Sequence, residues 1–258
     1  MLNFFIKLPI LKRLIPSIYK KYIFFTKNYF KEVKVNNVYY NLDLRHLIDR
    51  RFYFHKKYEE ELFIPLVNTI RNNNIDIFFD IGSCWGLYSL RLSKIFPNLQ
   101  INSFEPIDQN IKRLNNSIKK NNINNIKIYN IALGSHVGNV ELGAIESYSP
   151  NFKINENKSV ITQKSEINYL DNIFIIKNKY LAFKIDTEGF ELEVLKGAKN
   201  LITNNKCYFQ IEINQKDIKN KEDVFNYLNE LNYKIISINK FNKTDYIFSN
   251  FELQNILL

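Results

Sequence analysis

Two hydrophobic periods alternate along most of this chain. From residue 75 onward, short apolar runs of strand length are followed by segments in which apolar residues recur at helical spacing. Strands that alternate with helices predict a parallel sheet with right-handed crossovers, whose ligand site lies at the carboxyl ends of the strands. The pattern predicts strands at 75–81, 100–104, 126–131, 181–185 and 207–213, and helices at 88–96, 108–120, 191–201 and 221–231.

The remaining patterned segments complete a Rossmann-like α/β fold. Residues 234–238 and 246–249 are typical of a final hairpin, which adds a C-terminal antiparallel strand to a mostly parallel, seven-stranded sheet. Residues 139–143 and 158–170 indicate an inserted hairpin and its connection. A hairpin at 33–44, turning at Asn36-Asn37, and a helix at 58–73 precede the main sheet. We therefore expect an N-terminal extension with a lid-like segment at 1–71 and the Rossmann-like domain at 72–258.

The first thirty residues differ in composition from the rest. They contain no acidic residue, and basic residues stand among Leu, Ile, Phe and Tyr. No apolar run approaches the roughly 20 residues of a spanning helix. Residues 1–30 are expected either to pack on the domain as a helical extension or to lie on an anionic membrane surface. Pro9 and Pro16 are expected to break this segment into short pieces.

Charge and cysteine usage narrow the choice of partners. The net charge is +10, but the abundance of Asn, Ile and Lys is typical of AT-rich coding sequence, which also explains the lysine excess. No nucleic-acid partner is therefore expected. Cys84 and Cys207 have neither metal-ligand spacing nor a disulfide pattern, and they indicate reduced thiols and a cytoplasmic protein. A place at the inner face of the membrane is the alternative that residues 1–30 leave open.

The first candidate site is the segment DIGSCWG, between the first main strand and its helix. Gly82 and Gly86 permit a tight turn and a close approach of the backbone to a ligand. Asp80 is expected to hold an ammonium group of a nucleoside ligand, directly or through water. Ser83 and Trp85 lie in the same loop and are expected to line the same site.

The next two strand ends extend this site. Glu105, followed by Pro106, ends the second strand, where a carboxylate accepts hydrogen bonds from both ribose hydroxyls of a nucleoside. Asn130 and Ala132 follow the third strand and are expected to frame the base.

The end of the fourth strand carries four ionisable side chains within eight residues, in the segment KIDTEGFE. Lys184 and Asp186 share one face of the strand because side chains repeat every two residues. A carboxylate beside an ammonium at the mouth of a parallel sheet can take a proton from an acceptor hydroxyl. Acidic residues also favour helix N-termini, which explains Glu188 and Glu191 without catalysis. Asp186, Lys184 and Glu188 are the catalytic candidates.

The fifth strand adds a further carboxylate. Gln210, Glu212 and Asn214 share a face, and a Glu in a buried strand is unusual without a partner. Glu212 is therefore the fourth catalytic candidate. Asp186, Glu212 and Asn214 could together bind a divalent metal ion, but a hydrogen-bonded acceptor site without metal is favoured.

These motifs resemble those of the FkbM-type methyltransferases. The resemblance runs from about residue 42 to 249 and rests on LDLR, FDIGSCWGLYSL, SFEP, IALGS and, most specifically, FKIDTEGFELEVLKGA. It implies a class I methyltransferase fold, S-adenosylmethionine as cofactor, and methyl transfer to a hydroxyl. A sugar hydroxyl of a surface glycan, or of a related small molecule, is the expected acceptor. The family often has a small residue where this chain has Trp85.

The sequence leaves three alternatives to this function open. They are a methyltransferase acting on a phosphate-bearing or amide modification of a glycan, an NAD-dependent oxidoreductase, and a non-catalytic nucleoside-binding module. An NAD-dependent oxidoreductase would be expected to have a third glycine in this loop, besides Gly82 and Gly86. Four further residues are interpreted as solvated surface that could contact an anionic acceptor or substrate: Arg45, His46, Arg50 and His136. Tyr58 and Glu59 are expected to cover the cofactor.

Overall fold

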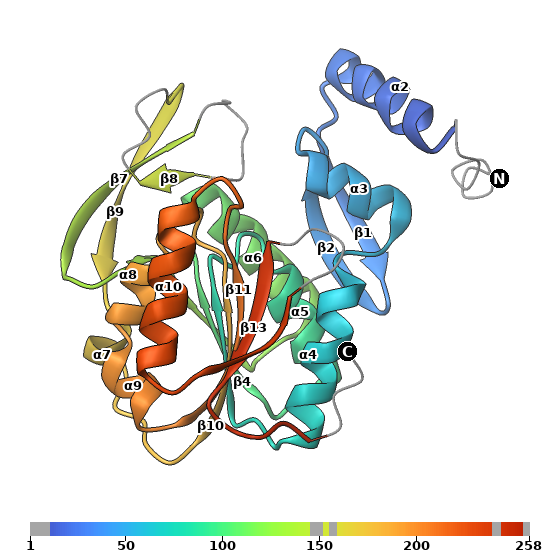
Figure 1. Cartoon of the computed structure of the whole chain (residues 1–258). Coiled ribbons are helices and arrows are strands. Elements are labelled where there is room, and N and C mark those ends of the chain that lie inside the picture. The colour runs from blue at the N-terminus through green and yellow to red at the C-terminus, as the bar shows by residue number, and fades with distance from the viewer. Residues whose placement is uncertain (1–10, 145–151, 155–158, 239–243, 255–258) are drawn as a thin grey trace.

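A seven-stranded mixed sheet forms the centre of the protein (Figure 1). The computed structural model describes residues 11–144, 152–154, 159–238 and 244–254. The strand order is β12-β13-β11-β10-β3-β4-β5, and β13 runs antiparallel to both its neighbours, as predicted from the sequence. The strands are β3 (Ile77–Ile81), β4 (Gln100–Phe104), β5 (Ile126–Tyr129), β10 (Tyr180–Ile185), β11 (Lys206–Glu212), β12 (Lys234–Ile238) and β13 (Asp245–Ser249).

Helices cover both faces of this sheet (Figure 1). One face packs on α4 (Glu60–Asn72), α5 (Leu87–Ile95) and α6 (Asp108–Asn121). The other packs on α8 (Glu191–Lys196), α9 (Lys199–Thr203) and α10 (Ile218–Glu230). Alternate residues of the central strands are buried on the two faces: Phe79 and Phe183 join the second core, and Phe78 and Ala182 the first. This alternation decides on which face each polar residue of the strand ends lies.

The single helix predicted at 191–201 is instead two helices, so that prediction is wrong in detail. The break falls at Gly197, which touches the carbonyl oxygen of Gly134: a Cβ there would lie 1.9 Å from it. The Gly197 carbonyl accepts a hydrogen bond from the backbone N–H of Asp171 at 2.9 Å. Close packing against neighbouring backbone therefore interrupts the helix, and periodicity does not reveal such a contact.

The N-terminal extension packs on the main domain. It contains α2 (Leu11–Thr26), β1 (Phe30–Val35), β2 (Val38–Asp43) and α3 (Leu47–His55), and β1 and β2 form the expected antiparallel hairpin. The helix α2 is continuous through residue 16, so the expectation of short broken pieces is wrong. Ile23 is buried among residues of β2, α5 and α6, and Asn121 of α6 hydrogen-bonds the backbone of Tyr39 through both its amide atoms.

Arg45, His46 and Arg50 were interpreted as solvated surface, and for His46 and Arg50 this is wrong. His46 is 3% and Arg50 is 7% exposed. Arg50 donates hydrogen bonds to the carbonyl oxygens of Leu44 and Arg45, and Arg45 pairs with the carboxylate of Asp43 at 2.5 Å. These side chains hold the turn between β2 and α3.

A second, smaller sheet is inserted after β5. Its strands, in the order β6-β9-β7-β8, are β6 (Ala132–Leu133), β9 (Ile161–Asn168), β7 (Gly138–Ala144) and β8 (Lys153–Ile154). The antiparallel pair of β7 and β9 is the predicted hairpin, and β6 and β8 enlarge it. A short helix, α7 (Leu170–Ile173), leads back to β10. No helix among the described residues is long and apolar enough to cross a membrane.

Candidate active site

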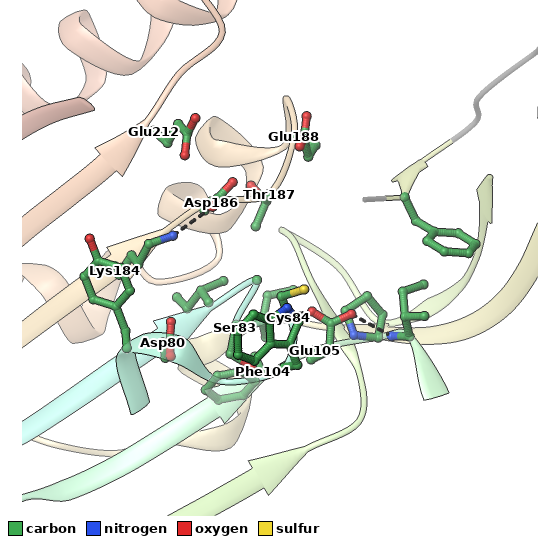
Figure 2. Close-up of a pocket in the computed structure, with 18 of the residues that line it drawn as sticks. Asp80, Ser83, Cys84, Phe104, Glu105, Lys184, Asp186, Thr187, Glu188 and Glu212 are labelled. Carbon is green, nitrogen blue, oxygen red and sulfur yellow. Dashed lines mark hydrogen bonds and ion pairs between the residues drawn. The ribbon is translucent and has the colours of Figure 1, made fainter. Parts of the chain in front are cut away.

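A cavity of about 330 Å³ opens at the carboxyl ends of β3, β4, β10 and β11. This is where a parallel α/β sheet binds its ligands, and the volume lies within the range of small-molecule sites. The polar lining residues come from strand ends far apart in the sequence, and Figure 2 shows them turned toward a common space. They include Asp80, Ser83, Glu105, Lys184, Asp186, Glu188 and Glu212.

A row of polar side chains crosses the central strands just below the cavity. Lys184 of β10 is paired in register with Asp80 of β3 and with Gln210 of β11, so all three point to the face covered by α4 and α5. Asp80 accepts hydrogen bonds from the backbone N–H and hydroxyl of Ser89 at 3.2 and 2.5 Å. Gln210 donates to the hydroxyl of Tyr88 at 3.0 Å. Helix α5 thus contributes the polar partners that make a buried charged row tolerable.

Lys184 and Asp186 form the central ion pair of the site. Their Nζ and Oδ2 atoms lie 2.8 Å apart, and Lys184 is almost fully buried while Asp186 is half-buried (Figure 2). Burial alone would lower the pKa of Lys184, but the surrounding carboxylates, led by Asp186, outweigh it and raise that pKa above its ordinary value. Lys184 therefore stays charged and fixes the carboxylate of Asp186 at the cavity wall.

Two further carboxyl groups face this pair. The charge of Asp186, followed by burial, raises the pKa of Glu212, so Glu212 tends to hold a proton beside the charged Asp186. Glu59 lies across the cavity at the start of α4, where it accepts a hydrogen bond from the Tyr88 hydroxyl at 2.9 Å. Burial also raises the pKa of Glu59. Tyr58 and Glu59, expected to cover the cofactor, both line the cavity.

Glu188 and Glu191, although close in sequence, lie in different surroundings. Glu191 is buried, and its Oε1 accepts hydrogen bonds from the N–H groups of Thr187 and Gly189 and from the Thr187 hydroxyl. Its other oxygen accepts from Asn220 at 2.6 Å. Glu191 thus shapes the loop before α8. Glu188 instead lines the cavity and pairs with Lys153 of the inserted sheet at 3.5 Å.

The glycines of the first loop are needed for contacts within the protein. Gly82 has φ of +75°, and a Cβ there would lie 1.8 Å from the carbonyl oxygen of Asp186. Gly86 has φ of +84° and faces a side chain of α6, Leu114. We expected these glycines to admit a ligand. Their first effect is to let the loop after β3 pack against the end of β10.

Ser83 and Trp85 occupy the two sides of the same loop. The hydroxyl of Ser83 is buried at the cavity wall, and no hydrogen-bond partner for it is found among the described residues. Trp85 lines the cavity with part of its ring and otherwise packs in the N-terminal core, with its ring centre 6.2 Å from Tyr40 and 6.0 Å from Phe52. The loop therefore offers one unused polar group and one large apolar wall to a ligand.

Glu105 is held rigidly at the end of β4. Its oxygens accept hydrogen bonds from the backbone N–H groups of Cys84 and Ile107, at 2.8 and 3.0 Å, and from the side chain of Asn110 at 3.1 Å. Burial nevertheless raises its pKa to about 7. Pro106 and Ala132 line the cavity beside it. Asn130 is exposed, donates to Asp108 at 2.7 Å and is not among the residues that line the cavity.

Parts of the cavity wall come from outside the motifs. Ile48 and Arg51 of α3 contribute one wall, and Phe152 and Ile154 of the inserted sheet contribute another. These segments carry no motif, and only their apolar character could have suggested burial. His136 is exposed and is not a cavity residue.

Among the residues that the structure describes, no group of three or more His, Cys, Asp or Glu side chains is placed to hold a metal ion. Asn214 is exposed beyond the end of β11 and accepts a hydrogen bond from the Lys216 N–H at 3.0 Å.

A family comparison decides what kind of site this is. The model of the methyltransferase FkbM domain matches residues 80–235, which is more than half of the chain and spans every strand end that lines the cavity. The chain belongs to the FkbM methyltransferase family. It is accordingly an S-adenosylmethionine-dependent methyltransferase, and the oxidoreductase and non-catalytic alternatives fall away. The comparison with curated proteins gives no match.

Several solved structures are similar to this FkbM methyltransferase. The methyltransferase FkbM from Methylobacillus flagellatus KT is 18% identical with a TM-score of 0.50, over 68% of this chain and 43% of that one. The present chain thus spans less than half of that protein's length. M. jannaschii TYW2 in complex with AdoMet is 12% identical with a TM-score of 0.46, over 86% and 84% of the two chains. A putative methyltransferase of Streptococcus mutans in complex with SAH is 13% identical with a TM-score of 0.45, over 75% and 97%.

Proposed function

We propose that this FkbM methyltransferase methylates a hydroxyl of a sugar or a related uncharged polyol, in the cytoplasm. The observation that supports this most is the Lys184–Asp186 ion pair at 2.8 Å on the cavity wall. It presents a charged carboxylate oxygen to the cavity, and such an oxygen can accept a hydroxyl proton. The free cysteines Cys84 and Cys207 fit a reducing compartment.

Residues of the loop after β3, together with Glu105, fit the cofactor. The Glu105 carboxylate has one lone-pair site left, on Oε2, for a ribose hydroxyl, and the unpaired Ser83 hydroxyl can donate to the carboxylate of the methionine end. The negative charges of Asp80 and Glu59 favour its ammonium and sulfonium groups. When bound, S-adenosylmethionine supplies a methyl group on a good leaving group, so the chain mainly has to align the acceptor.

Charge distinguishes between acceptor classes. Six carboxyl groups line the cavity among the described residues, against two cations, Lys184 and Arg51. Lys184 is already paired with Asp186. A phosphate-bearing acceptor would meet this excess of negative charge, so an uncharged hydroxyl acceptor is favoured. A second cavity shares Asp186, Glu188 and Glu212 with the first and extends toward 214–216, and we assign the acceptor to this side.

The test is a methyl-transfer assay with matched acceptors. Release of S-adenosylhomocysteine is measured with neutral sugars, amino sugars and sugar phosphates at equal concentration. We expect neutral or amino sugars to be methylated and sugar phosphates to fail. Asp186→Asn should lower transfer about 100-fold or more while retaining S-adenosylhomocysteine binding, and Glu230→Gln, at the exposed far end of α10, is the matched control. Methylation of sugar phosphates alone would contradict the acceptor assignment.

A further inference from the structure

Helix α2 exposes a row of large apolar side chains to solvent. Ile18, Tyr22 and Phe25 are 64%, 58% and 88% exposed. Their spacing of four and three residues places them on one face of the helix. We name these three residues the α2 stripe.

Other residues of α2 attach the helix to the rest of the protein. Tyr19 stacks on Tyr53 of α3 with ring centres 5.7 Å apart, and Ile23 is 1% exposed. The helix is therefore anchored through one face while the α2 stripe lies on another. An exposed row of this kind, rather than single scattered residues, marks an interaction surface.

The surroundings of the α2 stripe are positively charged. Lys20, Lys21 and Lys27 are all exposed, and the first acidic residue in the sequence is Glu32. Glu32 forms an ion pair with Lys120 at 3.2 Å, so its charge is partly balanced within the protein. Apolar side chains with lysines around them complement a surface that is apolar inside and negatively charged outside.

We propose that α2 docks this methyltransferase on an anionic phospholipid membrane. The α2 stripe would enter the boundary between headgroups and acyl chains, and the lysines would contact the acidic headgroups. No helix of the described part of the chain can span a bilayer, so this attachment is peripheral.

The docking surface lies close to the catalytic cavity. Helix α3, on which Tyr19 packs, supplies Ile48 and Arg51 to the cavity wall. In Figure 1, α2 and the inserted sheet lie at the same end of the molecule, where the strands end at the active site. Docking through α2 therefore brings the cavity to the membrane, which suits a hydroxyl acceptor carried on a lipid. This last step rests on the proposed function, whereas the docking itself does not.

The experiment is cosedimentation of the full chain with vesicles of phosphatidylcholine alone or with phosphatidylglycerol. We expect binding to the anionic vesicles, with weaker binding at high salt. Replacement of Lys20, Lys21 and Lys27 by Gln should weaken it roughly 100-fold, since each basic residue near an anionic surface contributes about tenfold or less. The triple variant Ile18→Ser, Tyr22→Ser, Phe25→Ser should weaken it on the order of 100-fold as well.

The matched control replaces three equally exposed apolar residues elsewhere, Val160, Ile175 and Ile218, by Ser. It should bind anionic vesicles like the parent chain. Affinity for S-adenosylhomocysteine, unchanged in all variants, shows that the fold and cofactor site are intact. Equal binding of the parent chain to neutral and anionic vesicles would overturn the proposal. Unchanged vesicle binding of the triple serine variant of the α2 stripe would do the same. So would a stripe variant that changes from dimer to monomer without losing vesicle binding, or a parent chain that binds nucleic acid but no vesicles.

Discussion

The raised pKa of Glu105 predicts that cofactor binding depends on pH near neutrality. Burial is its first cause, and it brings the pKa to about 7 despite three hydrogen bonds to the carboxylate. A ribose hydroxyl that donates to the remaining site on Oε2 is held best by the ionised form. Affinity for S-adenosylhomocysteine should therefore rise as the pH rises through 7. The apo protein behaves oppositely: Glu105 makes the free energy of unfolding fall between about pH 4.5 and 7, since the folded state holds the proton more tightly.

The magnitude follows from the ionised fraction of Glu105. That fraction is about 0.9 at pH 8 and about 0.03 at pH 5.5, so the affinity should fall about 30-fold between these two values. Calorimetric titration with S-adenosylhomocysteine at several pH values measures this directly. Glu105→Gln keeps the side-chain size and should bind more weakly at pH 8 but with little pH dependence. Wild-type protein with a flat profile, or a Gln variant with an undiminished slope, would refute the assignment of Glu105 to the ribose.

Three further predictions concern catalysis and stability. Asp186→Asn should lower turnover about 100-fold or more without changing the melting temperature, as measured by methyl transfer and calorimetry; wild-type turnover would make Asp186 structural. Gly82→Ala should destabilise the protein by more than about 2 kcal/mol because its Cβ meets the Asp186 carbonyl, whereas Gly138→Ala, whose Cβ would make only ordinary van der Waals contacts, should be tolerated. Arg113→Leu should cost about 3–5 kcal/mol in urea unfolding by leaving buried Asp49 without its ion pair. Beside Arg113 the pKa of Asp49 is about 6, because burial raises it, and loss of the cation should raise it further; the loss should therefore shrink as the pH falls toward 6, and a pH-independent loss would contradict the mechanism.

The sequence predicted the central sheet well because each strand end carries both an apolar run and a polar signal. The pairing of Lys184 with Asp186 follows from the alternation of a single strand, which is a local property. Periodicity and spacing therefore sufficed for the strands and for the residues at their ends.

Long-range contacts account for what the sequence did not reveal. The role of Gly82 depends on a carbonyl more than a hundred residues away. The burial of His46 depends on Arg113 of α6, whose guanidinium also pairs with Asp49. In the sequence, Glu191 resembles any acidic residue at a helix start. The structure shows that it accepts three hydrogen bonds from the loop before α8 and one from Asn220.

The origin of the cavity walls has an evolutionary consequence. Ser83 and Glu105, which we assign to the cofactor, belong to the strand ends of the sheet, whereas Ile48 on α3 and Ile154 on β8 belong to peripheral additions. Changes in α3 or in the inserted sheet alter the cavity without disturbing the sheet core or the loop after β3. Variation in these two short segments can therefore reshape the cavity while the residues that we assign to the methyl donor stay the same.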